Sequence, residues 1–128
     1  MIKRVKRVKR AKRLLIVDDA LIMRKRIRDI AEEAGWEVAG EAKDGEEAIA
    51  AYERARPDLV TLDIIMPKMD GVAALKGIRA ADAEAQVIMI SAVDQREKLT
   101  ECISHGALDF IVKPFDADRL RKIFGKYL

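Results

Sequence analysis

The feature that most restricts the fold of this chain is a regular alternation of short apolar runs with amphipathic segments. The most apolar runs occupy residues 14–17, 59–62 and 87–90, and two further strands are expected over 36–42 and 108–112, where Glu37, Glu41 and Asp109 interrupt the apolar residues. Unbroken aliphatic runs of this length are typical of strands buried on both faces of a parallel sheet. The segments between the runs carry apolar residues at helical spacing. Five strands alternating with five helices predict an α/β fold with a doubly wound parallel sheet.

Capping residues place the expected helix ends. Gly35 is expected to end a first helix over 20–34 in the left-handed conformation, and Asp44 with Glu47 forms a capping box for a helix over 45–55. The later helices are expected to start at Asp70-Gly71, at a cap formed by Asp94 and Glu97, and near Asp116. On the first helix we expect solvent exposure for Arg24, Lys25, Arg26 and Arg28. Trp36, at a strand start, is expected to be partly packed.

Charge is distributed unevenly along the chain. Residues 1–13 contain eight Lys or Arg and no acidic residue, whereas the rest of the chain carries 17 basic and 22 acidic residues. We therefore expect a basic extension over 1–12 and a mildly acidic domain over 13–128. Because the domain is mildly acidic, it is not itself expected to bind nucleic acid. It is not expected to insert into a membrane either, because no apolar run approaches the length of a membrane span. The single cysteine, Cys102, fits a reducing cytoplasm.

Polar residues follow four of the five apolar runs. They are Asp18-Asp19, Asp63, Ser91 and Lys113. Because all strands of a parallel sheet end on one edge, these side chains are expected to share one pocket. Two carboxylates about 4 Å apart repel each other by roughly 4 kcal/mol at an effective dielectric constant near 20. A cation relieves that repulsion, and an all-oxygen set of ligands favours Mg²⁺. Such a pocket suits phosphoryl transfer to a carboxylate.

The same residues carry a resemblance to a known family. Asp18-Asp19, the segment from Leu62 to Gly71, Ser91-Ala92 and the segment Lys113-Pro114-Phe115 resemble the motifs of response-regulator receiver domains. The resemblance covers residues 13–128. It implies the flavodoxin-like (βα)5 fold of the CheY type with strand order 2-1-3-4-5. It also implies a cis Lys113–Pro114 bond.

Site roles follow from the resemblance. Asp63 is expected to accept a phosphoryl group from a sensor histidine kinase or a histidine phosphotransfer domain. Mg²⁺ is expected on Asp19, Asp63 and the backbone carbonyl of Ile65, with Asp18 acting largely through water. Ser91 and Lys113 are expected to bind phosphoryl oxygens.

The resemblance further implies a switch. Ser91 is expected to move toward the phosphoryl group, and the ring of Phe110 to rotate into the vacated space. This couples the site to a surface made by the fourth and fifth helices and the last strand. A core aromatic at Phe110 fits the same sequence. The stretch Asp18 to Arg24 looks similar to stand-alone chemotaxis regulators, so a flagellar-motor partner is one expected output.

Other functions stay open at the sequence level. A pseudo-receiver that binds partners without phosphorylation is one alternative, and the isolated receiver of a longer regulator is another. An enzyme of the haloacid dehalogenase type has a second Asp two residues after the nucleophile, where this chain has Ile65. We therefore expect no turnover of external substrates. The resemblance implies that Ile65 and Val93 flank the path of the water that would attack the phosphoryl group. Because both are apolar, slow loss of the phosphoryl group is expected.

Overall fold

The computed structural model describes residues 10–92 and 94–128. A single sheet of five parallel strands runs in the order β2-β1-β3-β4-β5. The strands are β1 (Arg13–Val17), β2 (Glu37–Ala42), β3 (Leu59–Asp63), β4 (Val87–Ala92) and β5 (Asp109–Lys113). The α/β doubly wound fold and the 2-1-3-4-5 order are both confirmed.

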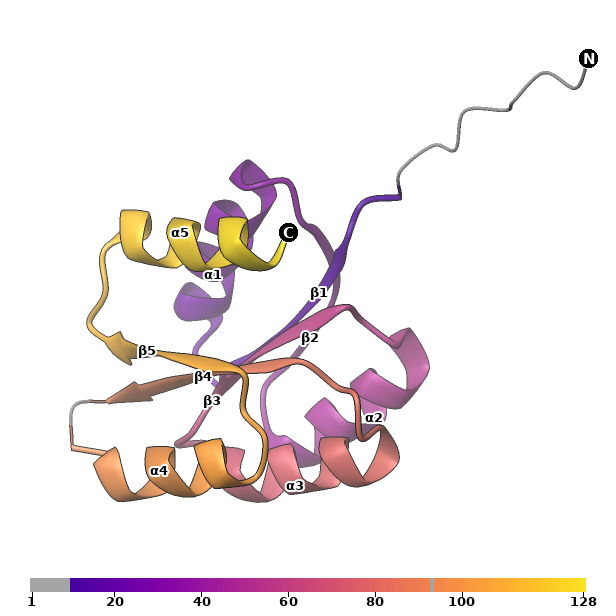
Figure 1. Cartoon of the computed structure of the whole chain (residues 1–128), viewed down its shortest axis with the longest axis vertical. Coiled ribbons are helices and arrows are strands. Elements are labelled where there is room, and N and C mark those ends of the chain that lie inside the picture. The colour runs from indigo at the N-terminus through magenta and orange to yellow at the C-terminus, as the bar shows by residue number, and fades with distance from the viewer. Residues whose placement is uncertain (1–9, 93) are drawn as a thin grey trace, which may run out of the picture.

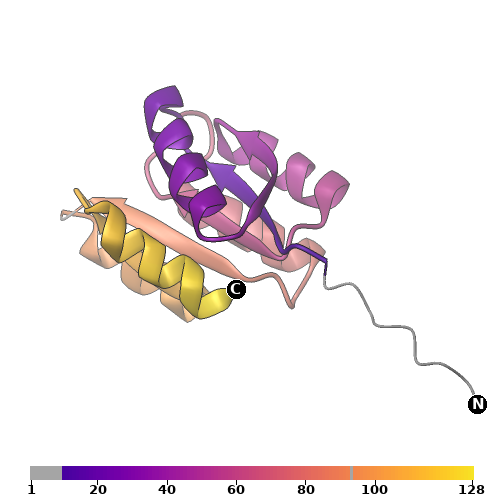
Figure 2. The ribbon, with the colours of Figure 1, turned by 90° about the horizontal axis from the view of Figure 1, so that it is seen from above.

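Helices cover both faces of the sheet. They are α1 (Leu21–Glu33), α2 (Gly45–Ala55), α3 (Gly71–Ala81), α4 (Arg96–Ser104) and α5 (Ala117–Tyr127). Figure 1 shows α1 and α5 on one face and α2, α3 and α4 on the other. The view from above in Figure 2 shows α1 and α5 at the near face. No helix in residues 10–92 and 94–128 is long and apolar enough to cross a membrane.

Alternate residues of the central strands feed two separate cores. On β1, Leu15 and Val17 pack toward α2, α3 and α4, whereas Leu14 and Ile16 pack toward α1 and α5. All four side chains are fully buried. Burial on both faces explains why these strands are unbroken aliphatic runs in the sequence. The sheet is thereby held rigidly from both sides, and its carboxyl edge is left for the site.

Three of the predicted helix starts have the expected cap. Asp44, Asp70 and Asp116 each accept a hydrogen bond from a backbone N–H in the first turn of the helix that follows. The Asp94 cap is wrong: α4 begins at Arg96 after Gln95, with no side-chain cap. The Gln95 N–H instead donates to the Ala92 carbonyl at 3.1 Å. This turn places the helix start one residue after the position that Asp94 would cap.

Trp36 is more buried than its position at a strand start suggests. Its side chain is 3% exposed, and its Nε1 donates to the Phe124 carbonyl at 2.9 Å. The Trp36 and Phe124 rings lie 6.2 Å apart between centroids. The expectation of partial packing is therefore wrong, because the last turns of α5 cover the indole.

Candidate functional site

The carboxyl edge of the sheet brings together the polar residues that end its strands. Asp63 is the last residue of β3 and lies beside Ile90 of β4. Ser91 follows on β4 and pairs with Val112, one residue before Lys113 at the end of β5. Asp18 directly follows β1. The structure thus gathers at one edge residues that lie up to 95 positions apart in the sequence.

Three carboxylates form the centre of this site. Oxygen atoms of Asp18, Asp19 and Asp63 lie within 4.8 Å of one another. Asp18 is fully buried and Asp63 is 6% exposed, whereas Asp19 is exposed. Closely spaced carboxylates with low solvent access repel one another unless a proton or a cation is present. Burial, together with the nearby Asp18 charge, raises the pKa of Asp63 to about 6, even though Lys113 opposes the shift.

Lys113 supplies a positive charge between two of the acids. Its Nζ donates to Asp18 Oδ2 at 3.0 Å and to Asp63 Oδ2 at 3.2 Å. Burial opposes the charge on this ammonium, but the hydrogen bonds and charges of Asp18 and Asp63 outweigh burial and raise the pKa of Lys113. One ammonium offsets the charge of one of the three carboxylates. With all three ionised, the cluster keeps a net negative charge that a further cation would neutralise.

Asp18 and Asp19 differ in how they are held. Asp18 Oδ1 accepts from the Ala20 N–H at 2.9 Å, and Lys113 binds the other oxygen. Among the described residues, no hydrogen bond ends on the Asp19 carboxylate, which faces solvent. Both oxygens of the Asp18 carboxylate therefore have hydrogen-bond partners within the protein, whereas the Asp19 carboxylate is available to a ligand.

Two loop segments border the acids. The Ile65 N–H donates to Asp63 Oδ1 at 3.4 Å, and the Ile65 side chain is 49% exposed. On the other side, the Lys113–Pro114 bond is cis, as expected. Arg26 of α1 donates to the Phe115 carbonyl at 2.8 Å, and its guanidinium lies 4.7 Å from the Phe115 ring centroid. The segment that follows Lys113 is thus fastened to α1.

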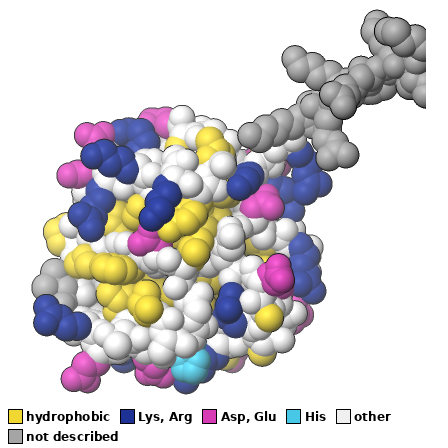
Figure 3. All heavy atoms as spheres, in the orientation of Figure 1, with side chains coloured by type: hydrophobic (Ala, Val, Ile, Leu, Met, Phe, Trp, Pro, Cys, Tyr) yellow, Lys and Arg dark blue, Asp and Glu magenta, His cyan; other side chains and the backbone are white. Residues whose placement is uncertain are grey.

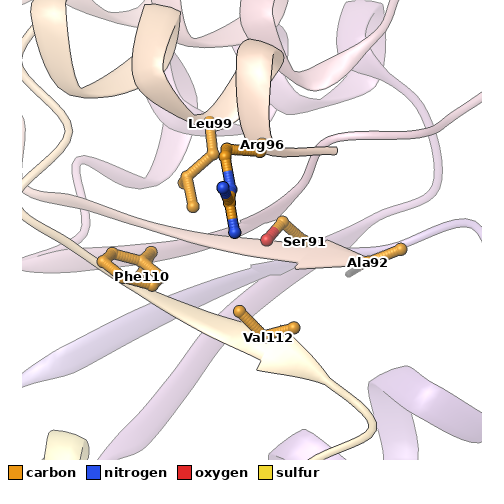
Figure 4. A pocket seen from close by; sticks show the side chains of 6 residues that line it. All are labelled: Ser91, Ala92, Arg96, Leu99, Phe110 and Val112. Carbon is orange, nitrogen blue, oxygen red and sulfur yellow. The ribbon is translucent and has the colours of Figure 1, made fainter. Parts of the chain in front are cut away.

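A pocket of about 350 Å³ adjoins the site between α4 and the last two strands. It is lined by Ser91, Ala92, Arg96, Leu99, Phe110 and Val112. In Figure 4 the Ser91 hydroxyl points toward α4, and Arg96 and Leu99 extend from α4 toward the strands. Phe110 is 38% exposed, so a core aromatic at this position is wrong. It lies on the edge strand β5, where no further strand covers it.

The surface around this pocket is apolar. Figure 3 shows hydrophobic side chains gathered between the two helix layers, over the β5 edge of the sheet. Three large apolar residues here are more than a third exposed: Ile103 of α4, Leu108 just before β5 and Phe110 of β5. Exposed apolar area of this kind marks interaction surfaces. Val93, one of the two residues of the expected apolar gate, lies outside the described residues.

Sequence reasoning missed the roles of several arginines. Arg24, Arg26 and Arg28 of α1 are all partly buried, so their expected solvent exposure is wrong. Arg24 and Arg28 bond Glu41 of β2, and Arg26 bonds the Phe115 carbonyl. Arg96 lines the pocket beside Ser91. A run of basic residues on a helix gives no sign of which partner each one reaches.

The comparisons with known proteins agree with this fold and site. Residues 14–124 match the family described as the response regulator receiver domain. The chain therefore belongs to that family of receiver domains.

Several relatives in this family carry the name chemotaxis protein CheY. That of Bacillus subtilis is 51% identical over 116 residues, which cover 91% of this chain and 97% of the relative. That of Thermotoga maritima is 49% identical over 115 residues, covering 90% and 96%. A solved CheX–CheY–BeF3–Mg²⁺ complex from Borrelia burgdorferi contains a chain with a TM-score of 0.84 and 39% identity, covering 91% of this chain and 90% of that one.

Proposed function

We propose that this receiver domain accepts a phosphoryl group on Asp63 from a histidine kinase or a histidine phosphotransfer domain, with Mg²⁺ as cofactor. The observation that carries the proposal is the cluster of three carboxylates within 4.8 Å, two of them bonded to the partly buried Lys113. Family membership supports it, since the cluster stands where receiver motifs have their acceptor site. A pocket of this kind can be both a metal site and a phosphoryl acceptor.

The residues present fit Mg²⁺. Three carboxylates face a single ammonium, so the cluster has an unbalanced negative charge that a hard dication would neutralise. Asp19, Asp63 and the Ile65 carbonyl would hold the ion, with Asp18 acting through water. When bound, Mg²⁺ supplies charge neutralisation for the acids and for the incoming phosphoryl oxygens.

The side chains of the site divide the chemistry between them. An ionised Asp63 oxygen attacks phosphorus, forming an acyl phosphate while the bond to the donor imidazole nitrogen breaks and the imidazole leaves. Lys113 orients Asp63 in the resting state through its 3.2 Å contact and then binds a phosphoryl oxygen. The Ser91 hydroxyl binds another. The protein uses its own carboxylate as substrate and turns over no external one.

The phosphorylated state is proposed to signal by binding a partner at the surface made by α4, β5 and α5. The pocket that holds Ser91 also contains Phe110, so a movement of Ser91 changes the packing around the ring (Figure 4). The apolar residues around Phe110 suit a protein partner. The names of the CheY relatives favour a chemotaxis output. The flagellar motor switch is the partner that the resemblance of the sequence to stand-alone chemotaxis regulators suggests.

Labelling with acetyl phosphate and Mg²⁺ tests this function. The parent protein is expected to take up one phosphoryl group, whereas Asp63→Asn is expected to take up none, as followed by intact-protein mass spectrometry. Asp29→Asn, on the exposed face of α1, is the matched control and should label like the parent. An unlabelled parent would identify a pseudo-receiver, and steady hydrolysis of acetyl phosphate without a stable product would identify an enzyme.

The phosphoryl group on Asp63 is expected to be long-lived. Ile65 is apolar and borders the acceptor, and Val93 is the second apolar residue of the predicted gate. Neither can orient a water for attack. The double variant Ile65→Asn with Val93→Glu should lose its label several times faster than the parent, measured as decay after removal of the donor. A parent that loses its label within seconds, or an unchanged lifetime in the variant, contradicts the gate.

A further inference from the structure

Arg24 of α1 joins the acidic site to the end of β2. Its Nη1 donates to the Asp18 carbonyl at 2.7 Å, and its Nε donates to Glu41 Oε1 at 2.9 Å. The Arg24 side chain is only 15% exposed. The guanidinium therefore uses two separate donors on two separate elements, in a largely buried place.

Glu41 is itself fixed. Its second oxygen accepts from Arg28 Nη2 at 2.6 Å, so the carboxylate lies between two guanidinium groups. Burial works against the charge of this carboxylate, but the hydrogen bonds from Arg28 and Arg24 outweigh burial and hold the pKa of Glu41 below its usual value. Because Arg24 bonds Glu41 through Nε and the Asp18 carbonyl through Nη1, the planar guanidinium is fixed in orientation as well as in position.

The carbonyl that Arg24 binds belongs to the peptide joining Asp18 to Asp19. The Asp18 N–H donates to the Ala42 carbonyl at 3.1 Å, so the main chain of Asp18 is held on both sides. Both Asp18 carboxylate oxygens are bonded as well. Asp19 has no such contacts, so the direction of its carboxylate depends on the backbone just before it.

We infer that Arg24, oriented by Glu41, is a positioning residue that holds the peptide between the two acids and so places Asp19 for Mg²⁺. This rests on the proposed function, since it concerns the metal that function requires. Removing a group that orients a metal ligand without touching the metal commonly weakens metal binding by about 10- to 100-fold. Because Arg24 acts on the backbone and not on a ligand atom, its loss is expected near the lower end of that range.

Removing Arg24 would change Mg²⁺ affinity in two opposite ways, through the loss of its positive charge and through the loss of its contact with the Asp18 carbonyl. Removing a cation near the acids makes the site more negative, which by itself strengthens Mg²⁺ binding. Arg24→Lys avoids this complication because it keeps the charge but lacks the fork that reaches Asp18 and Glu41 together. The pair Arg24→Gln with Glu41→Gln also leaves the net charge unchanged. Arg54→Lys is the matched control for the exchange of Arg for Lys, since Arg54 is exposed on α2 and is not part of the Arg24–Glu41–Arg28 network.

Isothermal titration with MgCl2, without any phosphoryl donor, measures the affinity of each full-length variant. Arg24→Lys and the charge-balanced pair are each expected to bind Mg²⁺ about tenfold more weakly than the parent, and Arg54→Lys within about twofold of it. In labelling with acetyl phosphate, the Mg²⁺ concentration for half-maximal rate should rise about tenfold in Arg24→Lys while the plateau rate stays within about twofold. If Arg24 contributed only to folding, a folded Arg24→Lys protein would keep the parent's Mg²⁺ concentration for half-maximal labelling rate.

Equal Mg²⁺ affinities for Arg24→Lys and Arg54→Lys would overturn the inference. If Arg24→Lys does not fold, the charge-balanced pair decides the question by the same comparison. A parent that binds Mg²⁺ but takes no label overturns the proposed function and leaves the Arg24 comparison standing. A parent that binds no Mg²⁺ overturns both.

Discussion

Asp19→Ala is expected to weaken Mg²⁺ binding by about 100-fold or more and to reduce labelling by acetyl phosphate to background at millimolar Mg²⁺. Asp19 is the exposed member of the carboxylate cluster, and no hydrogen bond among the described residues engages its side chain. Its removal costs the protein no internal contact but takes a full negative charge from the metal. A loss of about 100-fold corresponds to about 2.7 kcal/mol, which is modest beside the attraction of a carboxylate and a dication in contact.

The measurement is a titration with MgCl2 followed by calorimetry, with unfolding by urea as a check that the fold is retained. Asp29→Ala on α1 is the matched control, because Asp29 is also exposed and, among the described residues, its one ion pair is an (i, i+4) contact with Lys25. That variant should bind Mg²⁺ like the parent. Tight Mg²⁺ binding by Asp19→Ala would contradict the metal assignment.

Gly71→Ala is expected to destabilise the protein by about 3 kcal/mol or more and to abolish phosphorylation. Gly71 starts α3 and its N–H donates to the Ile64 carbonyl at 2.6 Å. A Cβ at this position would lie 2.6 Å from the Ile64 Cα and still closer to the Asp63 carbonyl oxygen. Overpacking against side chains costs about 1–3 kcal/mol, and the backbone met here cannot rotate away. The end of β3 must shift, and it carries the acceptor.

Gly125→Ala provides the contrast. Gly125 lies inside α5, is exposed, and would place a Cβ in open space. This variant should gain about 0.5–1 kcal/mol, because Ala is the better helix former. Urea unfolding of both variants against the parent gives the two free energies, and the labelling assay gives activity. If Gly71→Ala changes neither the free energy of unfolding nor the labelling, then α3 can move away from the acceptor loop without cost.

Much of the fold follows from local patterns. The runs 14–17, 59–62 and 87–90 predict buried parallel strands because they contain no charged residue and only one polar residue, Thr61. The strand order is different: alternation alone gives a doubly wound sheet, and the order 2-1-3-4-5 comes from the family resemblance. Exact helix starts depend on the turn before them, as the start of α4 after Gln95 shows.

The site separates into a part that sequence reveals and a part that it cannot. Asp18, Asp63 and Lys113 are predictable because parallel strands end on one edge, so position along each strand is enough. The contact of Arg24 with Asp18 spans only six residues but depends on Glu41, 17 residues further on, for its orientation. The exposure of Phe110 depends on β5 being the sheet edge. These properties arise from the tertiary packing of long side chains, which residue type alone does not encode.

The burial of Trp36 also determines how this protein can be observed optically. It is the single tryptophan of the chain, and it precedes β2 at the amino end of the sheet, opposite the acidic edge. Its indole N–H is bonded to the last turns of α5 and its ring rests against Phe124. Intrinsic fluorescence therefore reports the docking of the C-terminal helix. Metal loading must be followed by another signal, so the two events can be recorded independently in one sample.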